Sequence, residues 1–203
     1  MNNENTKDST LNGSNNKEQE LDRETFTPEI ARKLEGYTDK FMCNVKDNTF
    51  KIKFLLFRVR DLESNQVLFE VETDETDLQD VEPVEDDEKR VIKYHLGPDF
   101  LDLTQLGSML KFSVGDNSVK NFLMIEKHYF KNKLIKAFEF KFDFCIENSV
   151  NTWETMYTIP ELSYKEKEEI ISTPWETRSD SFYFVEDKLI MHHKALYNYS
   201  NFE

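Results

Sequence analysis

The clearest pattern of hydrophobic and polar positions lies between residues 120 and 146. From residue 138 onward, apolar and polar side chains alternate at every position, which is typical of a strand with one buried face. Residues 122 to 130 are equally apolar, and only the polar residues 131 to 133 separate the two stretches. This spacing predicts an antiparallel hairpin. Its apolar face forms either the filled core of a β-sandwich or the wall of a cavity. The predicted row consists of Phe138, Phe140, Phe142, Phe144 and Ile146.

Further alternating stretches predict a chain made mainly of strands. Residues 50–60 and 66–71 pair across a turn, residues 90–96 end at a Gly-Pro break, and apolar positions continue from Leu101 and Leu103 towards residue 114. Another strand covers 153–159, and a final hairpin joins 181–185 to 189–199.

Two short helices are predicted beside these strands. Thr27 is an N-cap followed by proline, with Gly36 as the stop, and Ser163 with Glu166 forms a capping box for a helix over 163–172. Eight or nine strands with one or two short helices indicate an all-β, immunoglobulin-like antiparallel β-sandwich.

Composition divides the chain into a tail and one domain. Residues 1–25 are polar and include only two leucines, so they cannot bury enough apolar surface to offset the entropy of ordering, and we expect a disordered tail. Residues 26–203 form the β-sandwich domain. Seventeen phenylalanines and eight tyrosines against five glycines and five prolines favour long strands with aromatic faces.

The net charge of −14 is concentrated in one stretch. Residues 72–90 contain ten acids and two bases, a charge of −8, and we expect most of this stretch to be a solvated loop. The remainder offers no strongly basic region. Nucleic acid and direct docking on an anionic membrane are therefore not expected.

The histidines and cysteines do not match the spacing of a metal site. His192 and His193 are adjacent in a strand and therefore point to opposite faces, and His95 and His128 lie on separate strands. There is no Cys-x-x-Cys, no Gly-x-Ser-x-Gly elbow and no nucleotide-binding glycine motif, although a Ser-His-Asp arrangement stays possible from sequence alone. We expect no metal, no cofactor and no enzymatic activity. With no signal peptide and no membrane-spanning apolar run, the sequence predicts a reduced, cytoplasmic protein.

Glu126 is the most informative polar residue. Alternation places Met124, Glu126 and His128 on one face of their strand and Lys127 on the other. If the first face is the inner one, a carboxylate lies at an aromatic interior and needs a partner. One interpretation is that Lys127 faces outward and Glu126 bonds a neighbouring strand. The other is that Glu126 accepts an amide proton from a bound molecule.

Several blocks of residues resemble the uncoordinated-119 family of lipid-binding chaperones, which is sister to the delta subunit of rod cyclic-GMP phosphodiesterase. The resemblance extends from about residue 27 to residue 199, and its most specific blocks are 121–130 and 179–185. It implies a β-sandwich whose sheets part to form a hydrophobic lipid pocket. It further implies a chaperone that extracts and solubilises N-myristoylated proteins, such as G-protein alpha subunits, and that releases them when a GTP-bound Arf-like GTPase binds. The residues that carry it are Asn121, Phe122, Met124, Ile125, Glu126, His128, Tyr129, Phe130, Phe142, Phe144, Cys145, Ile146, Asn151, Thr152, Ser179, Asp180, Ser181, Phe182, Tyr183, Phe184 and Val185.

The resemblance also implies particular site residues. Tyr94 and Glu126 match the positions that bond the acylated N-terminal glycine, and four rings match those that line the acyl channel. Ile159 and Thr155 stand where the family often has phenylalanine and histidine. Ordinary core packing is the alternative for each ring. The four predicted lining rings are Phe54, Phe100, Tyr157 and Tyr183.

Two other functions fit the same fold. The 151–153 sequence Asn-Thr-Trp also occurs in the delta subunit, so a carrier of prenylated proteins is the first alternative. A non-lipid interaction module with a filled interior is the second. In each case we expect a monomer that does not insert into membranes, and a ciliary location depends on the organism.

Overall fold

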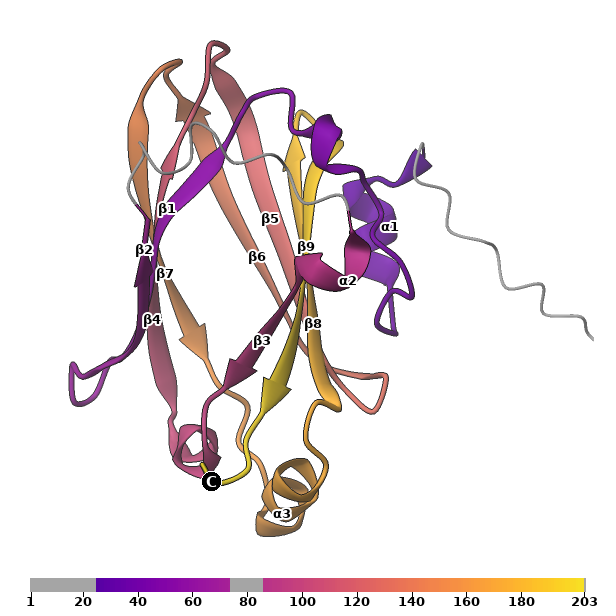
Figure 1. Cartoon of the computed structure of the whole chain (residues 1–203), viewed down its shortest axis with the longest axis vertical. Coiled ribbons are helices and arrows are strands. Elements are labelled where there is room, and N and C mark those ends of the chain that lie inside the picture. Colours follow the sequence, from indigo (N-terminus) through magenta and orange to yellow (C-terminus); the bar gives the residue numbers. More distant parts are fainter. Residues whose placement is uncertain (1–24, 74–85, 203) are drawn as a thin grey trace, which may run out of the picture.

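A computed structural model of the chain describes residues 25–73 and 86–202, and within them nine strands form two facing sheets (Figure 1). The four-stranded sheet has the order β2-β1-β4-β7, and the five-stranded sheet has the order β3-β9-β8-β5-β6. The predicted all-β sandwich is confirmed. The strands are β1 (Lys53–Asp61), β2 (Val67–Glu72), β3 (Val91–His95), β4 (Gln105–Ser113), β5 (Val119–Phe130), β6 (Lys133–Cys145), β7 (Val150–Thr158), β8 (Thr177–Val185) and β9 (Lys188–Asn198).

The pairing differs from the purely antiparallel expectation at one edge. Strand β3 pairs in parallel with β9, while the other paired strands are antiparallel. Two boundaries also differ: β8 begins at Thr177 rather than at residue 181, and residues 98–102 form a 3₁₀ turn, η3 (Pro98–Asp102), so that β4 begins only at Gln105. The proline that favours a tight turn there keeps Leu101 and Leu103 out of the strand.

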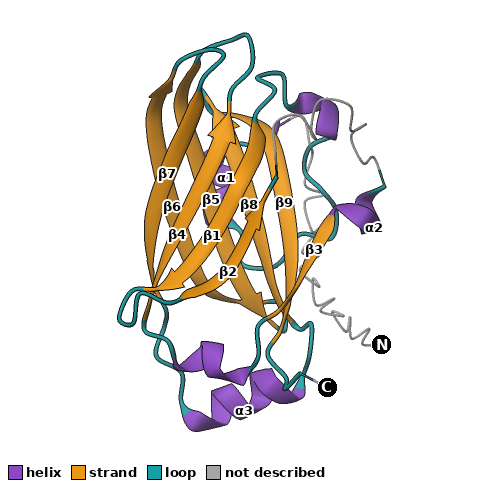
Figure 2. Cartoon of the chain, turned by 60° about the vertical axis from the view of Figure 1, so that its left-hand side comes forward, coloured by secondary structure: helices purple, strands orange, loops and turns teal. Residues whose placement is uncertain are grey.

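Short helices cap the sandwich and cover one face. Thr27 caps α1 (Pro28–Lys33), which ends before the predicted stop at Gly36, and the predicted capping box of Ser163 and Glu166 begins α3 (Tyr164–Ser172). Helix α3 lies at one end of the sandwich (Figure 2). Two further short helical segments, η2 (Val45–Asp47) and α2 (Asp87–Arg90), were not predicted.

The hairpin of β5 and β6 is confirmed, but the alternation of β6 changes near its end. The first three phenylalanines face the interior, whereas Phe144 and Ile146 are 50% and 60% exposed and Cys145 is buried. On the paired strand, Asn121 has φ +51°, in the left-handed region, which breaks the two-residue alternation. The prediction that Phe144 and Ile146 belong to the inner row is therefore wrong.

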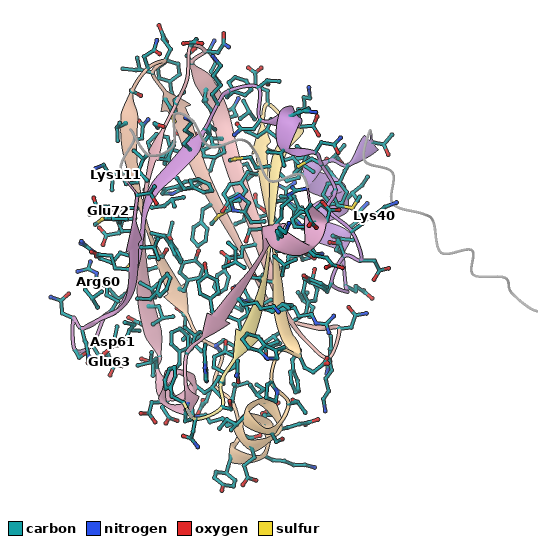
Figure 3. The ribbon with its side chains drawn as sticks, in the orientation of Figure 1. Lys40, Arg60, Asp61, Glu63, Glu72 and Lys111 are labelled. Atoms are coloured by element: carbon teal, nitrogen blue, oxygen red, sulfur yellow. The ribbon has the colours of Figure 1, made fainter. Side chains whose placement is uncertain are left out.

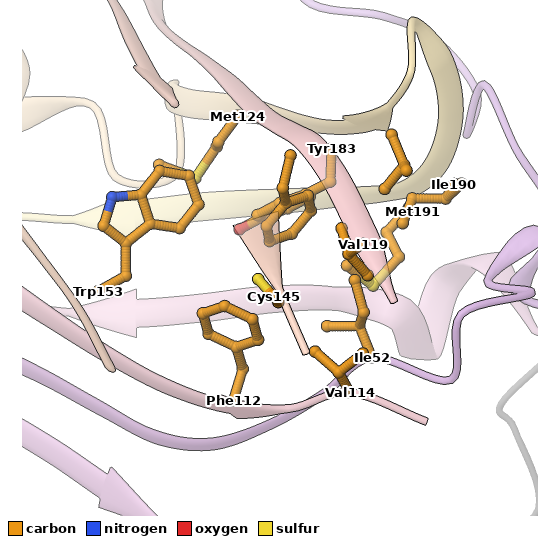
Figure 4. Packing of buried hydrophobic residues seen from close by; sticks show 12 residues of the cluster. Ile52, Phe112, Val114, Val119, Met124, Cys145, Trp153, Tyr183, Ile190 and Met191 are labelled. Carbon is orange, nitrogen blue, oxygen red and sulfur yellow. The ribbon is translucent and has the colours of Figure 1, made fainter. Parts of the chain in front are cut away.

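One end of the sandwich is filled by a buried hydrophobic core. Phe112 and Phe122, both fully buried, belong to a cluster contributed by strands of both sheets. Figure 4 shows Phe112 with other members of this cluster. The rings of Phe112 and Phe122 are 5.7 Å apart. Each buried aromatic side chain contributes about 1.5–3 kcal/mol by leaving water. This end of the molecule is a filled core, as the first interpretation of the aromatic row predicts.

The outer face of the five-stranded sheet is covered by residues 25–48. Beneath this segment Asp180 is fully buried and accepts hydrogen bonds from the Thr38 backbone at 2.8 Å and from Lys194 at 3.0 Å. His192 Nε2 lies 3.0 Å from the same carboxylate, and its Nδ1 accepts from the Met42 N–H at 2.9 Å. Because Nδ1 accepts a hydrogen bond, His192 is the neutral tautomer that donates to Asp180 through Nε2. This buried network joins the covering segment to β8 and β9.

Lys127 takes part in the same attachment. Its side chain points away from the interior, as the alternation predicts, but it is only 1% exposed. Its ammonium donates to the carbonyls of Ala31 at 2.9 Å, Arg32 at 2.8 Å and Leu34. These carbonyls lie at the C-terminal end of α1, where a cation is favoured, and the Ala31 carbonyl also accepts from the Leu34 N–H at 3.3 Å. Lys127 therefore lies on the outer face of β5, as the alternation predicts, but α1 covers this face and shields the side chain from solvent.

Two sequence predictions fall outside the described residues. Residues 1–24 of the expected tail (1–25) and residues 74–85 of the acidic stretch (72–90) lie outside the part of the chain that the structure describes. Where the structure does describe the chain, no helix has the length and apolar character needed to cross a bilayer.

Candidate functional site

A cavity of about 570 Å³ lies between the sheets, next to the packed core. This volume is within the range of small-molecule binding sites. Its walls are mainly aromatic and aliphatic, while charged residues such as Arg60, Glu63 and Lys111 lie at the outer side of the four-stranded sheet (Figure 3). The two alternatives considered for the aromatic row of β6, a filled core and a cavity wall, both apply. Phe138 lines the cavity, whereas Phe142 packs against the core.

The structure brings all six sequence-predicted residues to this cavity, from both sheets and from one end. Phe54 belongs to β1 and Tyr157 to β7, so the four-stranded sheet supplies two of them. The five-stranded sheet supplies three, and η3 supplies the last. The complete set is Phe54, Tyr94, Phe100, Glu126, Tyr157 and Tyr183.

Glu126 is a largely buried carboxylate in an otherwise apolar wall. Its side chain is 14% exposed, and its two oxygens are 2.9 Å from His128 Nε2 and 2.9 Å from the Tyr157 hydroxyl. Burial raises the pKa of Glu126, but the hydrogen bond and charge of His128 and the hydrogen bond from Tyr157 outweigh it, and the net pKa lies below the usual value. Since Tyr157 lies on the facing sheet, its hydrogen bond to Glu126 spans the cavity.

Tyr94 lines the cavity without bonding Glu126. Its ring lies between those of Phe69, at 5.3 Å, and Tyr197, at 5.5 Å. Burial and the charge of Glu126 raise the pKa of Tyr94 to about 12, so the hydroxyl is protonated at neutral pH. Within residues 25–73 and 86–202 this hydroxyl has no hydrogen-bond partner. It is therefore free to bond a ligand.

The packed core closes one end of the cavity, and some of the lining residues are exposed at the surface. Trp153, Met124 and Tyr183 belong both to the packed core and to the cavity lining, so they form the closed inner end. Among the lining residues, Ile92 is 41% exposed beside β2, and Lys136 is exposed on β6. An elongated apolar group could therefore enter from a side and extend towards Trp153.

Several polar side chains line the cavity beside the predicted residues, among them His128, Ser181 and His193. Alternation placed His128 on the same face as Glu126, but Ser181 and His193 were not predicted as lining residues. The alternation of β9 does predict that His192 and His193 face opposite sides, and this is confirmed, because His192 lies under the covering segment instead. The signal for His193 was present in that alternation, but only together with the knowledge of which face of β9 is the inner one. Within the described part of the chain, no group of three or more metal-binding side chains is present.

Acidification between about pH 6.5 and pH 4 is expected to destabilise the fold. Burial, with the charges of His192 and Arg90, lowers the pKa of His193 from 6.5 to about 4, and burial also lowers the pKa of His192. In this window the unfolded chain binds a proton at His193 that the folded chain does not bind, which lowers the free energy of unfolding by up to about 1.4 kcal/mol for each pH unit. The lowered pKa of His192 acts in the same direction. Urea unfolding at pH 7, 6 and 5 measures the effect. His193→Gln should flatten the profile, and a constant free energy of unfolding between pH 7 and 5 would contradict the prediction.

Comparison with known proteins identifies the family. A family model described as GMP-PDE, delta subunit, matches residues 46–199. The chain is 44% identical over 174 residues to Protein unc-119 of Caenorhabditis briggsae, covering 86% of this chain and 80% of that protein. It is 41% identical over 179 residues to Protein unc-119 of Caenorhabditis elegans, covering 88% and 82%. It is 43% identical over 183 residues to Protein unc-119 homolog B of Homo sapiens, covering 87% and 73%.

These similarities cover the whole sandwich, including the strands that build the cavity. They also agree with the apolar lining and with a lipid-binding role in protein trafficking. The chain therefore belongs to the unc-119 family, which is related to the GMP-PDE delta subunit and is a family of binding and transport proteins rather than of enzymes.

Proposed function

We propose that the protein is a chaperone that extracts and solubilises N-myristoylated proteins, such as G-protein alpha subunits. The observation that carries this proposal is the position of Glu126, a buried hydrogen-bond acceptor in the wall of an apolar cavity. An acyl chain linked to a glycine amide offers a long apolar group next to an N–H donor. The cavity offers an apolar space next to a carboxylate that can accept from that donor.

Burial of the chain supplies most of the binding free energy. At about 0.8 kcal/mol per CH₂, a myristoyl group gains roughly 10 kcal/mol on leaving water. It gains nearly as much in a bilayer, where a single myristoyl chain binds with a constant of only about 10⁴ M⁻¹. A few polar contacts are therefore enough for the cavity to compete with a membrane. Glu126 is the first proposed contact and the free hydroxyl of Tyr94 is the second.

The same polar contacts favour an acyl amide over a prenyl group. A prenylated cysteine carries a thioether next to its chain, and a thioether has no hydrogen to donate. Placing it beside Glu126 would leave the carboxylate with its internal partners, His128 and Tyr157, and without a ligand contact. The prenyl-carrier alternative becomes one of the outcomes of the binding test.

Cargo release is proposed to depend on a GTP-bound Arf-like GTPase. The sandwich has open strand edges at β2 and β7 and at β3 and β6, and a partner strand can pair with such an edge. Because the strands of each sheet also form the cavity walls, pairing at an edge can change the pocket, with a coupling free energy of about 1–3 kcal/mol. In this proposal the protein acts as a cytoplasmic monomer.

Extraction from vesicles tests the function. A myristoylated G-protein alpha subunit is bound to neutral liposomes, the purified protein is added, and the liposomes are sedimented. The alpha subunit is expected to move to the supernatant with the protein, and an unrelated acidic protein at equal concentration serves as the control. Addition of a GTP-loaded Arf-like GTPase, but not its GDP form, should return it to the liposomes. If the alpha subunit stays on the liposomes at a large excess of the protein, the proposed function is wrong.

A further inference from the structure

A row of three polar side chains crosses the inner face of the five-stranded sheet. The strand register places Glu126 on β5 opposite Ser181 on β8, and Ser181 opposite His193 on β9. Neighbouring strands are about 4.8 Å apart, so the row spans about 10 Å. All three residues line the cavity. They lie side by side across the inner face of the sheet, in a cavity whose walls are mainly aromatic and aliphatic.

Two members of this row have no side-chain hydrogen-bond partner within residues 25–73 and 86–202. The His193 ring packs against the rings of Phe54 and Tyr183, each at 5.2 Å. Among the residues that the structure describes, neither His193 nor Ser181 has a side-chain hydrogen bond. Burial and nearby positive charge hold the pKa of His193 at about 4, so the ring is neutral at pH 7 and carries one N–H donor. The Ser181 hydroxyl is a second donor. Glu126, in contrast, is ionised and can only accept.

The inward-facing residues of β5, β8 and β9 that come next on either side of this row, called levels here, differ in polarity. On the side of the packed core, the next level consists of Met124 opposite Tyr183 and Tyr183 opposite Met191, and it is closed by Trp153. On the other side, the next level contains His128 opposite Ser179. The row therefore separates the apolar inner end from a more polar part of the cavity.

This arrangement matches the two polar groups of an acyl amide. An amide that enters an apolar cavity loses water from both its N–H and its carbonyl oxygen, and each group that stays unpaired costs free energy. Glu126 can accept from the N–H but cannot donate to the carbonyl. A carbonyl oxygen has two lone pairs, and the row supplies two unused donors next to the acceptor.

We propose that His193 and Ser181 donate hydrogen bonds to the carbonyl oxygen of the acyl amide while Glu126 accepts from its N–H. This inference rests on the proposed function and assigns a specificity role to His193 beyond that of lining the cavity. The acyl chain then extends towards Met124 and Trp153, and the peptide leaves past His128. The site selects lipids that are attached through an amide.

The test uses two lipid peptides, one with and one without the carbonyl oxygen. The nitrogen of the second is a charged amine, so the effect of each variant is measured relative to the unmodified protein on the same peptide. One carries a myristoyl group on its N-terminal glycine, and the other carries a tetradecyl group on the same nitrogen, without the carbonyl oxygen. His193→Phe keeps a ring of similar size but removes the donor. This substitution is expected to lower the affinity for the myristoyl peptide by about tenfold and the affinity for the tetradecyl peptide by less than about threefold. Ser181→Ala, which barely changes volume, should show the same selectivity with a smaller effect.

Two further variants serve as controls. His193→Gln keeps an N–H donor and should retain the affinity for the myristoyl peptide within about threefold. His95→Phe changes a histidine outside the cavity and should change neither affinity. Equal losses for both peptides with His193→Phe would mean that the ring only packs, and the inference would be wrong although the proposed function stands. Absence of myristoyl-peptide binding by the unmodified protein would overturn both.

Discussion

Replacing Glu126 by alanine is expected to weaken the binding of a myristoylated N-terminal glycine peptide by about 10- to 100-fold. The carboxylate is the proposed acceptor for the glycine amide, and a hydrogen bond to a charged group contributes about 1.5–3 kcal/mol. The loss of this acceptor leaves the amide N–H of the cargo unpaired in an apolar cavity. Fluorescence polarisation with a labelled peptide measures the change.

Tyr157→Phe is the matched control for this prediction. It removes the hydroxyl that bonds Glu126 at 2.9 Å but keeps the carboxylate and the ring that lines the cavity. Affinity should therefore change by no more than about threefold, because the cargo amide can take the place of the tyrosine hydroxyl. Tyr94→Phe removes the free hydroxyl, and its loss of affinity should lie between those of Glu126→Ala and Tyr157→Phe. If Glu126→Ala and Tyr94→Phe both leave the affinity unchanged, these residues do not contact the cargo.

Replacing Asp180 by alanine is expected to lower the free energy of unfolding by about 3–5 kcal/mol. The carboxylate is fully buried and is bonded by Lys194, His192 and Thr38. Removing one member of a buried ionic network leaves the remaining charge, here Lys194, in a low-dielectric interior without compensation. The substitution also removes the hydrogen bonds that Thr38 donates to β8, which help to attach residues 25–48 to the sheet, so the loss should appear in the whole cooperative transition.

Urea unfolding at pH 7 measures this effect. Asp116→Ala removes an exposed carboxylate paired with Lys51 at 2.5 Å and is expected to leave the urea midpoint unchanged, because exposed ion pairs contribute little. Asp180→Asn keeps the shape of the side chain and one acceptor oxygen, so its urea midpoint should lie between those of Asp180→Ala and Asp116→Ala. A midpoint for Asp180→Ala equal to that of Asp116→Ala would contradict the structural role given to this network.

Local sequence patterns predicted the strands, the hairpin of β5 and β6 and both capped helices, because each depends on neighbours within a few residues. The parallel pairing of β3 with β9 depends on chain segments about a hundred residues apart, and no local pattern encodes it. The burial of Lys127 has a similar cause. Alternation gave its direction, but only the fold places the end of α1 over that side chain.

In the candidate site, too, some features were predicted from the sequence and others depend on the fold. The resemblance to known proteins gave the six lining residues, and the alternation of β5 gave the orientation of Glu126. The partners of Glu126 could not be predicted, since Tyr157 reaches it from the facing sheet. The row of Glu126, Ser181 and His193 depends on the registers of β5, β8 and β9 together, and register across three strands is a property of the fold.

The central claim is that the cavity holds an acyl chain attached to an N-terminal glycine. The most direct measurement is fluorescence polarisation of the purified protein with one labelled peptide in three forms: myristoylated at its N-terminal glycine, unacylated, and farnesylated on a cysteine. We expect tight binding of the myristoylated form and no measurable binding of the unacylated one, with the farnesylated form at least tenfold weaker. Preference for the farnesylated peptide would identify a prenyl carrier instead. Binding of none of the three would contradict the account and would leave a non-lipid interaction module as the function.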